Sequence, residues 1–104
     1  MRVGVVGCGY WGSKHVRVLS SLPEVSSVVA VDSDESRRST MTQRFADRGF
    51  DDLSSAVDHV DAVIVAVPPR LHFEVAYEAI AAGKHVLVEK PLATSVEEAR
   101  KLID

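Results

Sequence analysis

Cysteine and long hydrophobic runs are scarce in this sequence, and each scarcity excludes a class of protein. The single cysteine, Cys8, cannot form an internal disulfide, which favours the reducing cytoplasm over a secreted location. The longest apolar run, residues 62–69, is far shorter than the roughly 20 residues that a membrane-spanning helix needs. The first residues are typical of a strand and a turn rather than a cleavable signal peptide. We therefore expect a cytoplasmic protein with no membrane partner.

Neither sign of charge dominates the chain. The 12 lysines and arginines oppose 15 aspartates and glutamates, and the basic residues are scattered along the sequence rather than gathered in runs. This pattern predicts no nucleic-acid partner and no anionic lipid partner. A chain of 104 residues, 46% of them hydrophobic, has the size and composition of one globular domain. We therefore treat residues 1–104 as a single domain.

Short β-branched runs alternate with longer amphipathic stretches along the chain. We expect strands at residues 2–6, 27–32, 49–50, 61–67 and 85–88. The run at 61–67 is apolar on both faces, which is typical of a parallel strand covered by helices on each side. This alternation predicts an α/β fold with a doubly wound parallel sheet, the dinucleotide-binding (Rossmann) fold. Because a complete fold of this type has a sixth strand, we expect the sequence to be truncated before it.

The stretches between these runs predict helices with recognisable ends. The first helix covers 12–22 and buries a stripe that includes Leu22. Asp34 is expected to cap the start of the second helix, and Gly49 its end. Another helix is expected to end at Gly83, and its apolar face consists of Leu71, Val75 and Ala79, flanked by Ala76 and Ile80. A last helix is expected after the fifth strand.

The segment after the first strand is the clearest functional motif. Residues 7–12, Gly-Cys-Gly-Tyr-Trp-Gly, match G-x-G-x-x-G at the start of a helix. Gly7 permits a tight turn, Gly9 lets a pyrophosphate approach the backbone, and Gly12 lets the helix pack close to the strand. The N–H groups and positive dipole at the helix start favour phosphate oxygens.

The other residues of this loop have more ordinary expected roles. Cys8 is interpreted as a small residue tolerated beside the strand. The side chains of Tyr10 and Trp11 are expected to pack rather than stack on a base, while their backbone N–H groups face the phosphates.

An acidic residue ends the second strand. Asp32 lies 20 residues after Gly12, where a carboxylate accepts hydrogen bonds from an adenosine ribose and repels a 2′-phosphate. With Ser33 beside it, Asp32 predicts NAD as the cofactor, with NADP disfavoured. Arg37 and Arg38 oppose that preference, because an arginine beside the ribose accepts the phosphate. The alternatives are a polar strand end for Asp32 and a solvated helix face for both arginines.

Two further clusters follow the fourth and fifth strands, at the sheet edge where ligands bind in open α/β folds. The first contains Val67, Pro68, Pro69 and His72. The second contains Glu89 and Lys90, whose lysine can donate a proton or a hydrogen bond near the nicotinamide. A surface ion pair is an equal alternative for Glu89 and Lys90, and a polar helix end for His72. The other histidines, at positions 15, 59 and 85, lack zinc-ligand spacing, so we expect no metal site.

Taken together, these segments carry a resemblance. The glycine loop, the aspartate after strand two, Ala-Val-Pro-Pro-Arg-Leu-His at 66–72 and Ala-Gly-Lys-His-Val-Leu-Val-Glu-Lys-Pro-Leu at 82–92 are similar to the Gfo/Idh/MocA family. That family includes glucose–fructose oxidoreductase and inositol dehydrogenase. The resemblance covers essentially the whole chain, and its most specific element is Glu-Lys-Pro at 89–91.

The resemblance implies an NAD(P)-dependent oxidoreductase acting on a sugar, nucleotide sugar or polyol. Lys90 would be the catalytic residue, reaching substrate and nicotinamide. Glu89, Pro68, Pro69 and His72 would line the cofactor site. The family's second, substrate-binding domain lies downstream of residue 104, so this chain alone is expected to be inactive.

Two alternatives stay open, and one expectation concerns assembly. The chain could be a standalone module that binds and senses a dinucleotide, or part of a dehydrogenase of another family that shares the glycine motif. The second alternative does not account for Glu-Lys-Pro after strand five. An apolar face left uncovered by a missing domain predicts self-association into a homo-oligomer.

Overall fold

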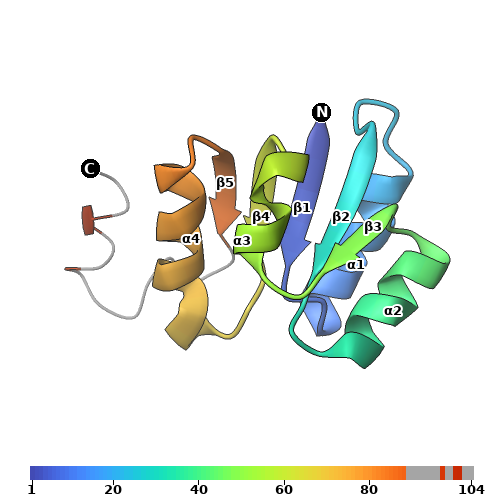
Figure 1. The fold of residues 1–104 in the computed structure, drawn as a ribbon, viewed down its shortest axis with the longest axis horizontal. Helices are drawn as coiled ribbons and strands as arrows, with labels where there is room; N and C mark the ends of the chain where they lie inside the picture. The colour runs from blue at the N-terminus through green and yellow to red at the C-terminus, as the bar shows by residue number, and fades with distance from the viewer. Residues whose placement is uncertain (89–96, 98–99, 102–104) are drawn as a thin grey trace.

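The computed structural model describes residues 1–88, 97 and 100–101, and it contains a five-stranded parallel sheet in the order β3-β2-β1-β4-β5 (Figure 1). The chain runs through these elements: β1 (Arg2–Val6), α1 (Tyr10–Ser20), β2 (Ser27–Val31), α2 (Glu35–Arg44), β3 (Arg48–Phe50), α3 (Leu53–Ala56), the 3₁₀ turn η1 (Val57–His59), β4 (Ala62–Val65), the 3₁₀ turn η2 (Pro69–Leu71), α4 (His72–Ala81) and β5 (His85–Val88). The expected parallel α/β fold is confirmed.

The sheet order changes direction at β1. From β1 the chain builds outward through β2 and β3, then returns to add β4 and β5 on the other side. All neighbouring strands are parallel, with Val6 level with Val31 of β2 and Val65 of β4. Such a reversal opens a crevice beyond the carboxyl ends of the central strands, which is where open α/β sheets bind ligands.

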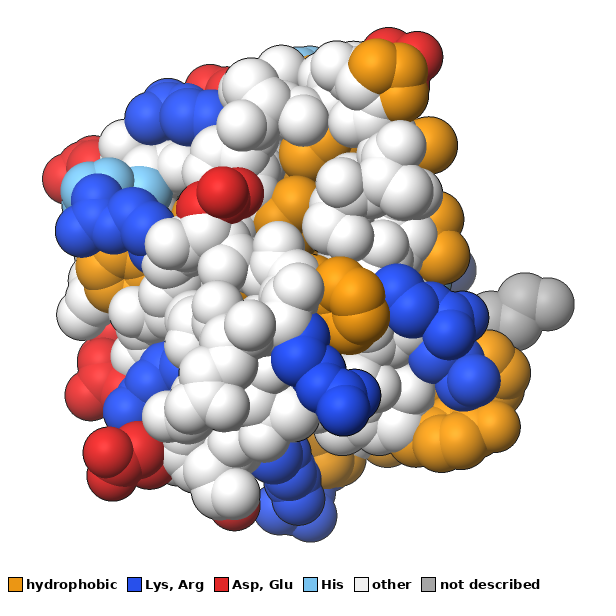
Figure 2. Space-filling view, turned by 90° about the vertical axis from the view of Figure 1, so that its right-hand side faces the viewer, with side chains coloured by type: hydrophobic (Ala, Val, Ile, Leu, Met, Phe, Trp, Pro, Cys, Tyr) orange, Lys and Arg blue, Asp and Glu red, His pale blue; other side chains and the backbone are white. Residues whose placement is uncertain are grey.

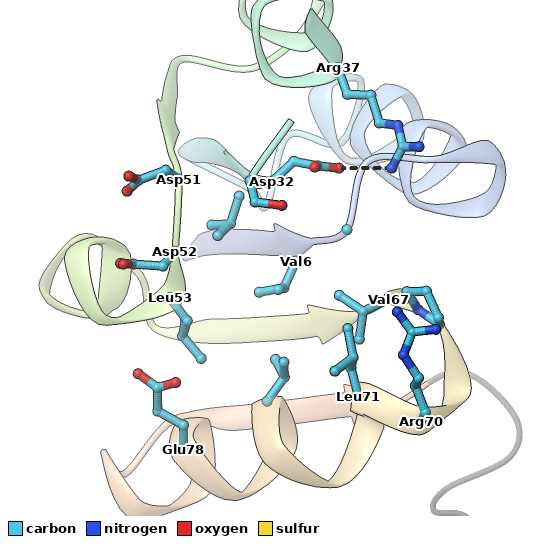
Figure 3. Close-up of a pocket in the computed structure, with 15 residues that line it drawn as sticks. Val6, Asp32, Arg37, Asp51, Asp52, Leu53, Val67, Arg70, Leu71 and Glu78 are labelled. Carbon is cyan, nitrogen blue, oxygen red and sulfur yellow. Dashed lines mark ion pairs between the residues drawn. The ribbon is translucent and has the colours of Figure 1, made fainter. Parts of the chain in front are cut away.

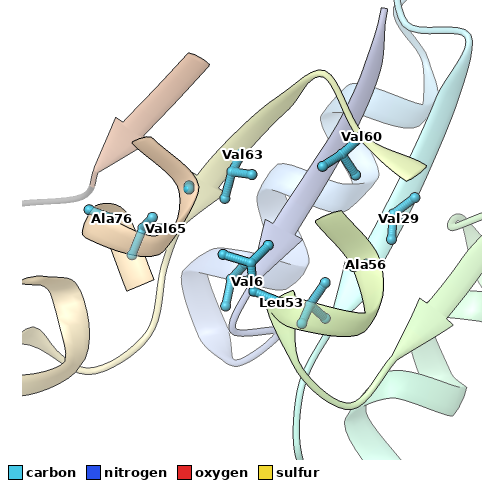
Figure 4. Close-up of a cluster of buried hydrophobic side chains, with 10 residues drawn as sticks. Val6, Val29, Leu53, Ala56, Val60, Val63, Val65 and Ala76 are labelled. Carbon is cyan, nitrogen blue, oxygen red and sulfur yellow. The ribbon is translucent and has the colours of Figure 1, made fainter. Parts of the chain in front are cut away.

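Helices cover the two faces of the sheet with separate apolar cores. The core beneath α3 and α4 is shown in Figure 4 and consists of Val6, Val29, Val31, Leu53, Ala56, Val60, Val63, Val65, Ala76 and Ala79. The core beneath α1 and α2 consists of Val3, Val5, Cys8, Val16, Val28, Ala30, Met41, Ala46 and Ile64. Alternate residues of each central strand enter opposite cores, which is why these strands are apolar on both faces.

Several expected helix boundaries are wrong. Helix α1 begins at Tyr10, two residues before the expected start, and ends at Ser20, so Leu22 lies outside it and is exposed. Gly49 does not cap α2 but lies inside β3. Helix α2 ends earlier because Phe45 leaves helical geometry, and the N–H groups of Phe45 and Ala46 both donate to the Met41 carbonyl.

The buried face of α4 differs from the expected one in part: Ala76 and Ala79 are buried as expected, whereas Ile80 is exposed. The turn η2 takes up Pro69–Leu71, so α4 starts at His72 and rotates His72, Ala76 and Ala79 into the core. Leu71 and Val75 lie only half-buried at the edge of that face. The expected helix end at Gly83 is confirmed: this residue adopts φ +77°, and its N–H donates to the Ile80 carbonyl. The helix expected after the fifth strand lies largely outside the described residues.

Candidate functional site

Three loops meet at the carboxyl edge of the sheet. The Gly7 N–H donates to the Val31 carbonyl at 2.8 Å, and the Ala66 N–H donates to the Val6 carbonyl at 2.8 Å. These bonds continue the strand pairing past the strand ends. As a result, the glycine loop, the segment at Asp32 and the β4–η2 loop lie side by side.

Two clefts open between these loops. The first, of about 390 Å³, lies between the end of β2, the β3–α3 loop and α4 (Figure 3). The second, of about 430 Å³, lies beside the glycine loop. Both volumes are in the range of small-molecule sites. Gly7, Arg37, Val67 and Pro68 line both clefts, so the two form one elongated crevice across the switch point of the sheet.

Two glycines of the loop are required by close backbone contacts. Gly7 has φ +93°, and a Cβ there would lie 2.8 Å from the backbone of Ala66 and Val67. A Cβ on Gly12 would lie 1.6 Å from the Gly7 carbonyl oxygen. Only glycine fits either position, because the turn at Gly7 lies against the β4–η2 loop and the start of α1 lies against that turn. This is the tight turn and close packing expected from the motif.

The third glycine faces open space. A Cβ on Gly9 would meet no atom within 4 Å. Gly9 is the residue before α1. No side chain caps the N-terminus of this helix, and its first turn contains no acidic residue. The first N–H groups of α1 and its positive dipole end are therefore left for an anionic ligand in the second cleft.

Asp32 ties the glycine loop to the end of β2. Its Oδ2 accepts a hydrogen bond from the Cys8 N–H at 2.8 Å, and its Oδ1 accepts one from the Asp34 N–H at 2.8 Å. The residue is only 8% exposed, and it lines the first cleft. A carboxylate has about four acceptor sites, so two remain for a ligand. Asp32 thus has the structural role of a polar strand end and also the geometry of a ribose acceptor.

The two arginines after Asp32 have different surroundings. Arg37 is 58% exposed on its side chain, and its Nη1 lies 3.8 Å from Asp32 Oδ2. Arg38 donates from Nη1 to the Asp32 carbonyl at 2.7 Å. Its stem passes so close to Gly49 that a Cβ there would lie 2.7 Å from Arg38 Cγ. A solvated helix face is therefore wrong for Arg38, which anchors the backbone at Asp32.

The β4–η2 loop forms the opposite wall. Val67, Pro68 and Pro69 line the second cleft together with His72. His72 is only 1% exposed, and its Nε2 lies 2.8 Å from the Val67 carbonyl oxygen. Because a carbonyl only accepts, Nε2 carries the proton of this bond. His72 is the first residue of α4, as the helix-end alternative has it, and its buried ring bonds to the β4–η2 loop.

The remaining loop residues divide between the core and the surface. Cys8 is buried, and burial raises the pKa of its thiol to about 11, with the charge of Asp32 adding to the effect. It is the small buried residue that was expected. Tyr10 and Trp11 are 71% and 62% exposed, so the expected packing of these side chains is wrong. Their rings meet edge to face at 5.1 Å on the rim of the second cleft.

The structure adds residues to the first cleft that the sequence analysis missed, namely Asp51, Asp52, Leu53, Arg70, Leu71, Val75 and Glu78. Asp51 and Asp52 directly follow β3, so their position at a strand end was the available signal. The Asp52 side chain caps the start of α3. Hydrogen bonds from the Ser55 backbone N–H and hydroxyl therefore lower the pKa of Asp52. Glu78 accepts an exposed hydrogen bond from the Ser54 hydroxyl at 2.7 Å, which joins α3 to α4.

The described part of the chain does not include every expected site residue. Glu89 and Lys90 lie outside the described residues, whereas Ser33 lines the first cleft beside Asp32. Within the described ranges, no cluster of histidine, cysteine or carboxylate side chains could hold a metal ion. No helix in those ranges is both long and apolar enough to cross a membrane.

Comparison with known proteins adds a family match over the whole chain. Residues 1–104 match the family described as an oxidoreductase family with an NAD-binding Rossmann fold. Inositol 2-dehydrogenase 2 of Saccharopolyspora erythraea is 38% identical over 108 aligned positions, which cover 100% of this chain and 32% of that protein. The chain therefore spans about a third of the length of the curated relatives it matches.

Two solved structures are similar in both sequence and fold. GenD2 from gentamicin A biosynthesis, in complex with NAD, has a TM-score of 0.92 and 41% identity, covering 98% of this chain and 30% of that one. KijD10, a 3-ketoreductase from Actinomadura kijaniata in complex with NADP and TDP-benzene, has a TM-score of 0.90 and 34% identity, covering 99% of this chain and 33% of that one.

Proposed function

Since the chain belongs to the oxidoreductase family with an NAD-binding Rossmann fold, we propose that it is the cofactor-binding part of a larger dehydrogenase. The substrate class we propose is a sugar, nucleotide sugar or polyol. The observation that carries the proposal is the single crevice that joins the glycine loop to Asp32 across the switch point of the sheet. The named relatives support the substrate class, because they include an inositol dehydrogenase and a ketoreductase crystallised with a TDP compound.

The shape of the crevice suits the two halves of a dinucleotide. We assign the adenosine half to the first cleft, where Asp32 would accept hydrogen bonds from the ribose hydroxyls. The pyrophosphate would lie over Gly9 at the start of α1, where a Cβ would find open space. The nicotinamide half would then extend into the second cleft, between Trp11 and Pro69.

The charges around the ribose support NAD over NADP. The Asp32 carboxylate lies in the first cleft and would repel a 2′-phosphate at short range. Arg37 weakens that repulsion, since its guanidinium lies 3.8 Å from the carboxylate and is largely exposed. Arg38 is held differently, because its Nη1 donates to the Asp32 carbonyl and the side chain is half-buried. We therefore propose a preference for NAD that Arg37 keeps moderate.

The proposed chemistry is hydride transfer, which the nicotinamide supplies when bound. The role proposed for this chain is to hold the dinucleotide and to bring Lys90 to the oxygen of the reacting carbon, where the lysine would donate a proton or a hydrogen bond. Glu89 is proposed to line the same region. Orientation of a sugar would require the remaining two-thirds of a protein of the relatives' length, so the chain alone should not turn over substrate.

Calorimetric titration of the chain with NAD and NADP tests the cofactor role. We expect NAD to bind more tightly, and we expect Asp32→Asn to reduce the preference about tenfold by removing the charge that repels the 2′-phosphate. The exposed Asp58→Asn, which removes one charge at the opposite end of the sheet, should leave the preference unchanged. A folded chain that binds neither dinucleotide would overturn the proposal. If the chain binds NAD and its gene encodes no longer protein, the result would instead favour the standalone sensing module.

Self-association is a separate proposal. Leu87 on β5, the outermost strand of the sheet on that side within the described residues, is 59% exposed, and it would offer an apolar contact to a second copy. Light scattering that shows only monomer at high concentration would contradict it.

A further inference from the structure

A third hollow lies on the outer surface, in a groove between α1 and α2. It has a volume of about 320 Å³, and its lining includes Tyr10, Lys14 and Arg17 from α1 and Arg44 from α2. The apolar part of the lining comes from Met41 and Phe45, together with the ring of Tyr10. The groove is separate from the cofactor crevice and shares only Tyr10 with it.

The cations of this groove are not neutralised. Lys14, Arg17 and Arg44 make no ion pair with any described residue, and no carboxylate lines the groove. The charged contact found there is a cation–π interaction, with Lys14 Nζ 4.7 Å from the centre of the Tyr10 ring. The groove is therefore a concentration of positive charge on a chain whose net charge is −3.

The fold creates this concentration from residues that are dispersed in the sequence. Among the charged side chains of α1 and α2, Glu35 alone is acidic, while the rest are lysine or arginine. Figure 2 shows the face on which these helices lie, where Lys and Arg side chains gather around apolar ones in its lower half and acidic side chains keep mainly to the edges. The basic residues are thus scattered along the chain but gathered in space.

We propose that the groove between α1 and α2 binds a phosphorylated small molecule that carries an apolar or aromatic group. Arginine presents a planar fork that matches phosphate oxygens, and two arginines with a lysine carry more than enough positive charge to neutralise a phosphate dianion. The apolar lining would contact the body of the molecule. A volume of about 320 Å³ suits a small molecule better than a protein segment.

The test is a titration of the chain with phenyl phosphate, followed by amide chemical shifts. The chain is first saturated with NAD, so that the cofactor crevice is occupied. We expect shifts at Lys14, Arg17 and Arg44 and none at Gly7. Raising the salt concentration should weaken binding, because the cations are exposed to solvent.

Two variants and a second probe sharpen this test. Arg44→Gln should weaken phenyl phosphate binding up to about fivefold, as expected for one exposed charge pair. Lys84→Gln removes the same charge from the α4–β5 turn and should have no effect. Methyl phosphate should bind more weakly than phenyl phosphate, because it cannot cover Phe45.

Several results would overturn the proposal. They are shifts confined to the glycine loop, equal effects of Arg44→Gln and Lys84→Gln, equal binding of methyl and phenyl phosphate, or tighter binding of a glutamate-rich peptide. Failure of NAD to bind would count against the proposed function only, because the same titration can then be repeated without NAD.

Discussion

Gly12→Ala is the substitution whose effect the geometry predicts most directly. The new Cβ would lie 1.6 Å from the carbonyl oxygen of Gly7 and 2.7 Å from its carbonyl carbon. These are backbone atoms, so no flexible side chain can move aside, and either α1 or the glycine loop must shift by more than about 1 Å. Such overpacking costs about 3 kcal/mol, because backbone atoms and not side chains must give way. For a domain of this size, that loss lowers the melting temperature by roughly 12 °C or more.

Gly9→Ala is the matched control, three residues away in the same loop. Its Cβ meets nothing within 4 Å, and its φ of −76° lies outside the left-handed region that favours glycine. The free energy of unfolding should therefore change by no more than about 0.5 kcal/mol. The same methyl group would occupy the space proposed for the pyrophosphate, so NAD affinity should fall at least about tenfold, a loss of about 1.4 kcal/mol.

Thermal unfolding followed by circular dichroism, with calorimetric titration of NAD, measures both effects. Equal melting temperatures for the two variants would refute the assignment of Gly12 to close packing. Unchanged NAD affinity in Gly9→Ala would refute the placement of the pyrophosphate over Gly9, even if the fold-stability result held.

Three further predictions concern stability and reactivity. The Arg2 side chain and backbone lower the pKa of Asp61 to about 2, so the stabilisation is present above pH 4 and is lost as pH falls through 2; urea midpoints of wild type and Asp61→Asn should differ near pH 5 and converge below pH 2. The Cys8 thiol, with a pKa of about 11, should react with iodoacetamide at pH 8 at least about 100-fold more slowly than in urea-unfolded chain. Gly83→Ala should cost about 1–2 kcal/mol because φ is +77° there, whereas Gly83→Asn should cost less, as urea midpoints would show.

The parallel sheet and the glycine loop could be predicted because both depend on short-range patterns. Buried β-branched runs mark the central strands, and the spacing of Gly7 and Gly12 reflects contacts between adjacent elements. The burial of Ala76 and Ala79 on α4 was predicted, but the burial of His72 was not, because η2 takes up the three residues after Pro68 and the helix starts only at His72. Apolar periodicity alone predicts that Leu71, not His72, is buried. The burial of His72 depends on the hydrogen bond between its ring and the Val67 carbonyl, which the sequence does not reveal.

The glycine loop and Asp32 were predicted as parts of the crevice, whereas several residues around them were not. Asp51 and Asp52 were missed because β3 has only three residues and provides little pattern from which to place its end. Arg38 was grouped with Arg37, although consecutive residues of a helix point about 100° apart. One of them therefore lies against Gly49 and the backbone of Asp32, and the other faces the carboxylate.

The dual role of Asp32 has a consequence for any change of cofactor. Its carboxylate holds the Cys8 N–H in place, so the glycine loop is already fixed relative to β2 before a dinucleotide binds. A substitution that removes the carboxylate would reduce repulsion of a 2′-phosphate, but it would also leave a buried N–H without its acceptor. Arg37 has no such structural duty, since it is exposed and contacts only the edge of the carboxylate. We therefore expect that selection between NAD and NADP can change through Arg37 at little cost in stability, whereas a change at Asp32 would disturb the glycine loop proposed to hold the pyrophosphate.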